Sequence, residues 1–435
     1  MRLKYINGNK KNFNNILETA LDKRRVKDPN KSLIVSKIIK NVKKNKDNAI
    51  IKYEKIFLKL KKIRNKDIKF SKLEIKNTIK RLDKKTKNSI DLAFNRIYKF
   101  HKKQKLNSYK INDAYKNSFS YSNSPINKVG VYVPGGIASY PSTVLMNCIP
   151  AMIAGVKEIY MTTPALNKKY NPAVLYAASK CKVKEVYKVG GAQAIAGLAF
   201  GTKIIKKVDK IVGPGNEFVA LAKKEVYGHV GIDMFAGPSE VTIVADSSAN
   251  PKWVAADLIA QAEHDKNAQC ILIANNKNIL KKVNDNLKVQ LKILPKRDIA
   301  KASLEKFGYF IYCKSKNNTI KIINEIAPEH LELCIKKPNQ LLKKIDNAGS
   351  IFIGNYSPEA MGDYLAGPNH VLPTSGSAKF ASGLSVYDFL KRHSVIKISK
   401  SGIERLGASV INLAEYENLK GHSNSIKLRL NKRIK

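Results

Sequence analysis

The sequence predicts the α/β fold class, with two Rossmann-like open α/β domains, one of them discontinuous, and helical extensions at both ends of the chain. Two observations carry this prediction. From residue 129, short apolar runs alternate with helical patterns across glycine turns, which is the order of a parallel sheet covered by helices. A second alternating block starts at residue 240. The chain has 435 residues, of which 43% are hydrophobic, enough to bury the cores of about two to four domains.

Residues 1–128 are charged, rich in asparagine and helical in pattern. Ser71 and Glu74 have the spacing of a capping box, which predicts the start of a long amphipathic helix running toward His101. We interpret this helix as scaffold.

The block from residue 129 is predicted to alternate between strands and helices. A strand at 129–133 precedes a helix that Gly155 closes. The next predicted elements are a strand at 156–161, a helix at 172–181, and strands at 183–189 and 207–212.

Three glycine turns in this block lie between a strand and the helix that follows it, at residues 134–136, 190–193 and 213–216. Such turns place free backbone N–H groups at the carboxyl ends of parallel strands, where phosphates and nucleotides bind. Glycine is also the ordinary residue of tight turns, and no GxGxxG follows the first strand. Both interpretations of the turns remain open.

The second block is predicted to have strands at 240–245 and 269–274. Asn250 is the expected N-cap of the helix between them, and another helix starts near residue 276. From Gly383 to the C-terminus the chain is predicted to be helical, with a largely apolar face.

The formal net charge is +46, from 80 Lys+Arg and 34 Asp+Glu. Such a charge is compatible with a nucleic-acid partner. However, only 11 of the basic residues are Arg and 69 are Lys, scattered among Asn and Ile. Proteins that bind nucleic acid draw heavily on Arg. We interpret the excess as the drift of an A/T-rich genome at surface positions, and expect no nucleic-acid partner.

The five cysteines are odd in number, far apart and without CxxC spacing, which argues against a disulfide framework or a thiolate metal site. No stretch approaches the roughly 20 apolar residues of a membrane span, and the N-terminus lacks the apolar core of a signal peptide. We therefore expect a cytoplasmic protein with no membrane partner.

Two pairs of polar residues are candidates for a site. Gln261 and His264 are three residues apart, on the same side of a predicted helix, as two metal ligands from one element would be. Pro328 predicts a helix start, where the positive end of the helix dipole would keep His330 neutral and let Glu329 stay ionised.

Four further polar residues follow toward the C-terminus. Asp363 and His370 lie in a polar, glycine-rich loop, and Glu417 lies on an apolar helix face five residues before His422. An amide, imidazoles and a carboxylate without a thiolate suit a divalent metal such as Zn²⁺ or Mn²⁺. The alternative is that each is an ordinary polar residue and that they share no site.

Together these motifs resemble those of the histidinol dehydrogenase family. Residues 232–241 followed by 256–264 are similar to the signature segment of that family. The resemblance runs in order from about residue 30 to 430, and its other matching segments are 131–136, 190–196, 213–216, 328–331, 367–374 and 417–422.

The resemblance implies an NAD-dependent oxidoreductase with one Zn²⁺ per subunit that oxidises L-histidinol via L-histidinaldehyde to L-histidine, the last step of histidine biosynthesis. It also implies a homodimer whose tails are exchanged, so that Glu417 and His422 serve the partner's site. Carried over by position, the zinc ligands are Gln261, His264, Asp363 and His422. The catalytic residues are Glu329 and His330, and the NAD contacts are Tyr132, Gln193 and Asn216. The substrate contacts are Ser239, Gln261, His264, His330, Asp363, His370, Glu417 and His422.

We expect the chain to divide into an N-terminal arm, two α/β domains and a tail. The ranges are 1–28 for the arm, 29–128 with 239–382 for the first α/β domain, which holds the metal and catalytic residues, 129–238 for the second, on the NAD side, and 383–435 for the tail. Two alternatives to this enzyme stay open: a sister dehydrogenase that oxidises another small alcohol, and a basic nucleic-acid-binding protein.

Overall fold

The computed structural model describes residues 3–431 except 11–12, 23–28, 60–61, 105, 136–139, 165–169 and 236. Contacts divide the chain into two compact units, the first formed by residues 1–104 and 127–388 and the second by residues 105–126 and 389–435. Of the predicted glycine turns, Gly136 lies outside the described residues.

The first unit contains two parallel sheets. Sheet A has six strands in the order β1-β11-β10-β9-β12-β13. Their bounds are β1 Lys4–Asn7, β9 Glu240–Ala245, β10 Gln269–Ala274, β11 Gly308–Tyr312, β12 His330–Cys334 and β13 Ser350–Ile353. The strands of the predicted second block, 240–245 and 269–274, are thereby confirmed.

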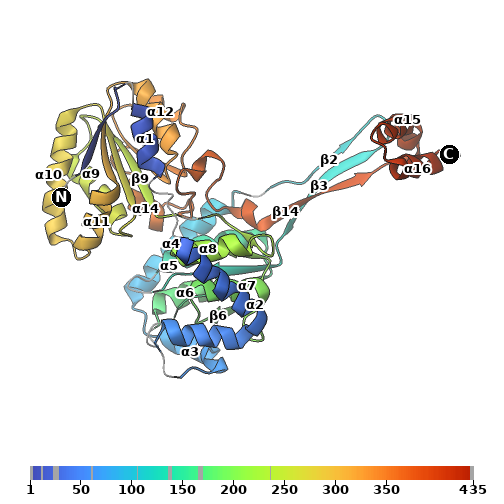
Figure 1. Cartoon of the computed structure of the whole chain (residues 1–435), viewed down its shortest axis with the longest axis horizontal. Coiled ribbons are helices and arrows are strands. Elements are labelled where there is room, and N and C mark those ends of the chain that lie inside the picture. Colours follow the sequence, from blue (N-terminus) through green and yellow to red (C-terminus); the bar gives the residue numbers. More distant parts are fainter. Residues whose placement is uncertain are drawn as a thin grey trace. The chain divides into compact units, whose positions relative to one another are not determined.

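Helices cover both faces of sheet A (Figure 1). On one face α9 (Pro251–Ala262), α10 (Lys277–Ile293) and α11 (Arg297–Phe307) pack on alternate strand residues, and α14 (Glu359–Tyr364) contacts α9. On the other face lie α1 (Phe13–Asp22), α12 (Lys316–Ile326) and α13 (Asn339–Leu342). The Asn250 side chain accepts a hydrogen bond from the N–H of Lys252, so the predicted N-cap of α9 is confirmed.

Sheet B has five parallel strands in the order β6-β5-β4-β7-β8. Their bounds are β4 Lys128–Tyr132, β5 Glu158–Thr162, β6 Glu185–Tyr187, β7 Lys210–Val212 and β8 Gly231–Ile232. The helices that follow its strands are α5 (Pro141–Ala154), α6 (Pro172–Lys180), α7 (Gly191–Phe200) and α8 (Glu217–Val226). The alternation predicted from residue 129 is confirmed, including the end of α5 at Gly155 in the left-handed conformation.

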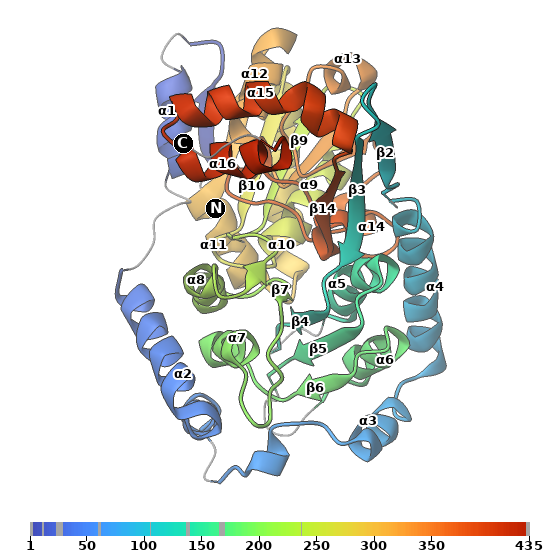
Figure 2. The ribbon, with the colours of Figure 1, turned by 90° about the vertical axis from the view of Figure 1, so that its right-hand side faces the viewer.

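The N-terminal segment contributes elements that pack on both parallel sheets. Helix α2 (Pro29–Phe57), which is kinked at Lys46, packs on α7 and α8 of sheet B, as Figure 2 shows for α2 and α7. Its apolar stripe, from Val35 to Ile50, meets the alanine-rich surface of α7. Helix α2 therefore packs on the helices of sheet B, while Arg96, farther along this segment, donates to the carbonyl oxygen of Leu365. Strand β1, in the expected arm, is an edge strand of sheet A.

The capping box at Ser71 and Glu74 is confirmed, but the long helix is not. Helix α3 (Lys72–Ile79) ends after two turns, and Asp83 caps a separate helix, α4 (Lys84–His101). The prediction of one continuous helix was wrong because the Asp83 side chain binds the N–H of Thr86 and starts a new helix.

The second unit is a three-stranded antiparallel sheet with two helices. Strand β14 (Leu390–Lys397) pairs along its whole length with β3 (Ser118–Pro125), which also pairs with β2 (Tyr109–Asn112). Helices α15 (Lys400–Tyr416) and α16 (Lys420–Arg429) follow. The prediction of an entirely helical tail was wrong for residues 390–397, because their partner β3 lies about 270 positions earlier and helical periodicity cannot reveal it. None of the described helices is long and apolar enough to cross a membrane.

Candidate active site

The predicted catalytic residues lie at the amino edge of sheet A. His330 is the first residue of β12 and pairs with Val241 of β9, while Glu329 lies just before the strand. The prediction of a helix start was wrong: Ala327 ends α12 in the left-handed conformation, and Pro328 leads into a strand instead.

His330 is held in one tautomer by the backbone. Its Nδ1 lies 3.1 Å from the carbonyl oxygen of Glu240, which can only accept, so Nδ1 carries the hydrogen and Nε2 keeps its lone pair. The ring is buried, and burial lowers the pKa of His330 to about 4. A neutral His330 is thus produced by burial, where the sequence predicted the dipole of a helix.

Glu329 is also buried, and its Oε2 accepts a hydrogen bond of 2.8 Å from the N–H of Glu240. Burial raises the pKa of Glu329 well above its usual range. The expectation that Glu329 stays ionised was based on a helix start, and the structure has a strand there instead. The carboxyl group lies 3.8 Å from His330 Nδ1 (Oε2 to Nδ1), so the acid and the base are neighbours.

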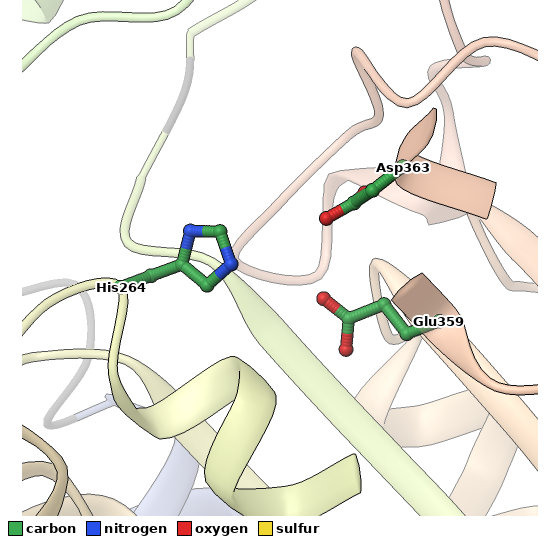
Figure 3. A group of neighbouring side chains, drawn as sticks. All are labelled: His264, Glu359 and Asp363. Atoms are coloured by element: carbon green, nitrogen blue, oxygen red, sulfur yellow. The ribbon is translucent and has the colours of Figure 1, made fainter. Parts of the chain in front are cut away.

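A cluster of three ligand-type side chains lies beside His330. His264, Glu359 and Asp363 each offer one ligand atom, and these atoms all lie within 4.8 Å of one another (Figure 3). His264 comes from the turn after α9, whereas Glu359 and Asp363 are one helical turn apart on α14. Asp363 Oδ1 lies 4.0 Å from His330 Nε2.

Gln261 adds an amide to this cluster. It is fully buried at the end of α9, and with its nitrogen turned toward Glu359 it would donate to that carboxylate at 2.8 Å and to the carbonyl of Glu240 at 3.2 Å. With its oxygen turned there, amide and carboxylate oxygens converge without a donor between them. One imidazole and three oxygen-bearing side chains make a donor set that suits a divalent cation such as Zn²⁺.

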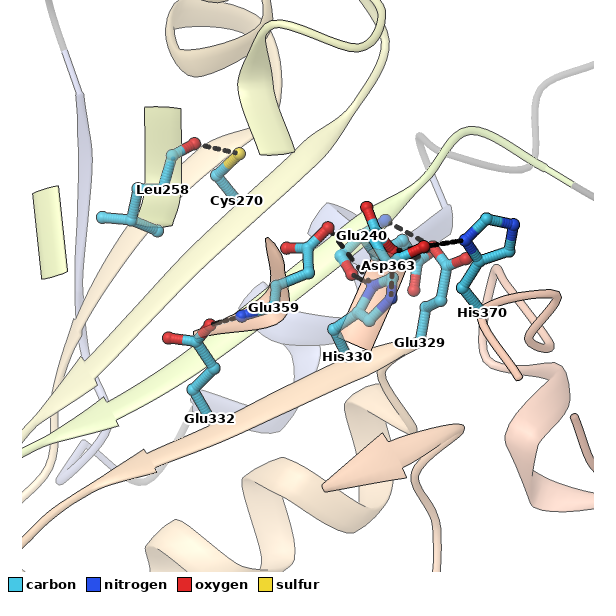
Figure 4. A network of polar contacts seen from close by, with 9 residues as sticks. All are labelled: Glu240, Leu258, Cys270, Glu329, His330, Glu332, Glu359, Asp363 and His370. Atoms are coloured by element: carbon cyan, nitrogen blue, oxygen red, sulfur yellow. Dashed lines mark hydrogen bonds and ion pairs between the residues drawn. The ribbon is translucent and has the colours of Figure 1, made fainter. Parts of the chain in front are cut away.

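His370 completes the group within the first unit. Its Nδ1 donates to the carbonyl oxygen of Asp363 at 2.9 Å, and burial lowers its pKa (Figure 4). The neighbouring Asn369 anchors the loop by donating to the carbonyl of Met146 on α5 at 2.7 Å. Ser239 lies immediately before β9 at the same edge of the sheet.

Glu417 and His422 belong to the second unit. Glu417 follows the last turn of α15, and His422 lies in the first turn of α16, both with exposed side chains. The structure thus brings together Gln261, His264, Asp363, His330, Glu329 and His370 in the first unit, and it describes Glu417 and His422 in the second.

Two buried acids, Glu359 and Glu332, and the half-buried Asp257 were not found from the sequence. Glu359 could have been suspected from its four-residue spacing to Asp363. Glu332 lies two residues after His330 on the same face of β12, and its Oε1 accepts from the N–H of Glu359 at 2.7 Å. Burial raises the pKa values of Glu332 and of its neighbour Asp257 on α9. Glu332 thus holds the first residue of α14.

The predicted NAD contacts lie at the carboxyl edge of sheet B. Tyr132 ends β4, Gln193 lies in the first turn of α7, and Asn216 caps α8 through the N–H of Val219 at 3.2 Å. The neighbouring strands β4 and β7 are where the strand order reverses, the usual position of a dinucleotide site.

The turn after β7 is held from both sides by a buried ion pair. Asp233 accepts from the N–H of Gly213 at 2.8 Å, Lys223 donates to the carbonyl of the same glycine at 3.0 Å, and the two side chains pair with each other. Gly213 has φ +113°, and a Cβ there would lie 2.2 Å from the carbonyl oxygen of Tyr132. The turn therefore requires glycine.

The comparisons with known proteins agree on one family. The histidinol dehydrogenase family profile matches residues 21–430. A histidinol dehydrogenase of Pelagibacter ubique is 54% identical over 432 residues, covering 99% of this chain and 100% of that protein, and one of Clostridium acetobutylicum is 48% identical, covering 90% of each. The crystal structure of histidinol dehydrogenase from Elizabethkingia anophelis matches with a TM-score of 0.91 and 38% identity, covering 99% of this chain and 98% of that one.

Proposed function

The chain belongs to the histidinol dehydrogenase family and is an oxidoreductase, and on that premise we propose that it oxidises L-histidinol via L-histidinaldehyde to L-histidine, the last step of histidine biosynthesis. Two NAD⁺ are reduced in succession at one site with one Zn²⁺ per subunit. The observation that carries the proposal is the neutral His330, with a free Nε2, beside the cluster of His264, Glu359 and Asp363.

His330 acts as the general base in both oxidations. Its Nε2 accepts the proton of the carbinol O–H as the hydride leaves the carbon, and NAD⁺, when bound, takes that hydride. After this proton has passed to solvent, the same nitrogen accepts the proton of the aldehyde hydrate in the second step. The hydrogen bond from Nδ1 to the Glu240 carbonyl keeps the ring in the tautomer that both steps require.

Glu329 activates the water molecule that adds to the aldehyde between the two oxidations. Its Oε2 is bound to the N–H of Glu240, which leaves Oε1 to accept a proton from the water that adds to the aldehyde carbon. Because the Glu329 carboxylate and the His330 ring are neighbours, hydration and the second proton transfer take place at one position, and the aldehyde need not leave the site.

The metal ligands proposed are Gln261, His264 and Asp363 with His422, and the buried Glu359 joins them in the cluster. When bound, Zn²⁺ would fix the imidazole and amine of histidinol and so orient its carbinol carbon. Ser239, His370 and Glu417 contact the substrate, and Tyr132, Gln193 and Asn216 contact NAD⁺.

The stoichiometry of the reaction tests this function. We expect two NADH for each histidinol consumed, loss of the activity after prolonged chelation, and its recovery when Zn²⁺ is added. One NADH per histidinol, or none, would contradict the two-step assignment.

We also propose a cytoplasmic homodimer in which the tail serves the partner's site, so that Glu417 and His422 complete a site built on the other chain. Mixing two inactive variants, His330→Ala and His422→Ala, then restores about a quarter of wild-type activity, because half of the mixed dimers' sites receive both intact histidines. If each tail served its own chain, the mixture would stay inactive.

A further inference from the structure

A carboxylate from α2 lies buried behind the glycine turn at the carboxyl end of β6. Glu54 is 1% exposed, and its Oε1 accepts two hydrogen bonds, from the N–H of Gly190 at 3.2 Å and from Nε2 of Gln193 at 2.8 Å. Burial raises its pKa to about 7. Burying a carboxylate costs free energy unless its hydrogen bonds compensate for the lost hydration.

The residues that Glu54 binds belong to the proposed NAD⁺ site. Gln193 is one of the expected contacts, and the N–H of Gly191, next to Gly190, donates to the hydroxyl oxygen of another, Tyr132, at 3.1 Å. Gly191 has φ +62°. The Glu54 side chain therefore supports a turn that contains a residue in the left-handed conformation. This turn lies at the carboxyl edge of sheet B, where the proposed NAD⁺ contacts are.

The bond to Glu54 also decides which end of the Gln193 amide remains available. Because Nε2 is bound to a carboxylate, Oε1 is turned away from Glu54 toward Gly191, and it is buried without a hydrogen-bond partner among the described residues. A buried unpaired acceptor calls for a donor. The hydroxyl groups and the carboxamide N–H₂ of a nicotinamide dinucleotide are donors of this kind.

We propose that Glu54 is a positioning residue for the dinucleotide: it holds the 190–191 turn and the amide of Gln193 in the arrangement that NAD⁺ binding uses. The inference rests on the proposed NAD dependence. Glu54 touches neither substrate nor cofactor and acts through Gln193 and the backbone of Gly190.

The same helix offers a matched control. Asp47, also on α2 and 8% exposed, accepts hydrogen bonds from the N–H groups of Lys203 (3.0 Å) and Ile204 (3.3 Å), in the loop after the other end of α7. Both acids therefore tie α2 to the surroundings of α7 by two hydrogen bonds each, but only Glu54 does so at the cofactor edge.

The experiment compares Glu54→Ala, Glu54→Gln and Asp47→Ala in the full-length enzyme. We expect Glu54→Ala to raise the KM for NAD⁺ by about tenfold or more, the scale of a lost hydrogen bond to a charged group, with kcat at saturating NAD⁺ and the KM for histidinol changed by less than about twofold. Glu54→Gln, which keeps an acceptor oxygen, stays close to wild type. Asp47→Ala lowers the melting temperature but leaves the KM for NAD⁺ unchanged.

Three results would overturn the proposal: equal effects of Glu54→Ala and Asp47→Ala on the KM for NAD⁺, no effect of either, or a rise confined to the KM for histidinol. If Glu54→Ala does not fold, Glu54→Asp, whose carboxylate is one methylene shorter, takes its place. A wild-type enzyme that produces no NADH from histidinol contradicts the proposed function instead, and direct titration of the same variants with NAD⁺ then still decides the role of Glu54.

Discussion

The two parallel sheets of the first unit carry their candidate site residues at opposite edges. Sheet B presents its carboxyl edge, where glycine turns and backbone N–H groups prevail, as open α/β sheets usually do. Sheet A gathers buried acids and histidines at its amino edge, around the starts of β9 and β12. In the proposed function, the backbone groups of sheet B bind a cofactor that exchanges twice per turnover, whereas the side chains of sheet A transfer protons and bind the metal.

The route of the helices explains how sheet A does this. Helix α9 leaves the carboxyl end of β9 and runs back, so that Gln261 and His264 arrive at the amino edge, and α14 returns in the same way with Asp363. Changes at the edge of sheet A should therefore impair chemistry or metal binding. Changes at the edge of sheet B should impair NAD⁺ binding.

The largest effect is expected from His330→Ala. Loss of the proposed general base should lower kcat by a factor of about 10² to 10⁴. The KM for NAD⁺ should stay near wild type, because the proposed cofactor contacts are in sheet B. Steady-state kinetics with histidinol and NAD⁺ measure both quantities. His229→Ala, at an exposed histidine of sheet B's loops, is the control. Near-native turnover of His330→Ala would contradict the assignment of the general base to the amino edge of sheet A.

A smaller effect on the same edge is expected from Glu359→Gln. The carboxylate lies within the ligand cluster, so its neutralisation should weaken Zn²⁺ binding by about tenfold or more, as competition with a chelator would show. Glu325→Gln, at an exposed acid paired with Lys379, should leave the affinity unchanged. If both variants bound Zn²⁺ like wild type, Glu359 would not belong to the metal site.

Gly213→Ala should act on the other edge. Its Cβ would lie 2.2 Å from the carbonyl oxygen of Tyr132, so the turn must move, and we expect the KM for NAD⁺ to rise by about tenfold, the scale of a displacement of order 1 Å in a binding site. Gly228→Ala is a matched control, because Gly228 also has a positive φ (+99°) but its added Cβ would meet nothing within 4 Å. A similar KM for both variants would show that backbone strain alone accounts for the result.

The last prediction concerns stability and its dependence on pH, and it involves no loss of activity. Folding raises the pKa of Glu54 from 4.5 to about 7, so its contribution to stability is full below pH 4.5 and is lost as the pH rises through 7. The Glu54→Gln variant does not titrate, and its free energy of unfolding relative to wild type should rise by roughly 2 kcal/mol between pH 5 and pH 8. Urea denaturation at the two pH values measures this, with Glu225→Gln, an exposed acid of α8, as the control. A constant difference would contradict the raised pKa.

The sheets differ also in how far the sequence predicts them. Four of the five strands of sheet B, all except the two-residue β8, could be predicted, because the alternation of strands and helices and the glycine turns are local signals. At sheet A the sequence indicated which polar residues are candidates for the site, but it did not indicate the secondary structure around them. Pro328 was interpreted as a helix start, because the left-handed conformation of Ala327 before it leaves no sequence signal.

The residues that escaped prediction act through contacts distant in sequence. Glu240 presents its carbonyl to a ring 90 positions later, and Glu54 meets Gln193 across 139 positions. Strand β14 exists because β3 is there to pair with it. Such partners are determined by the folded chain, and neither periodicity nor spacing within one segment reports them.

The separate unit that carries Glu417 and His422 has one more consequence if, as proposed, it completes a site on another chain. Each working site then needs two molecules, so the activity per molecule falls on dilution as dimers dissociate, by mass action. Assays at nanomolar and micromolar enzyme would give different specific activities. The quantity of protein that a cell makes would then influence the output of each molecule as well as the total.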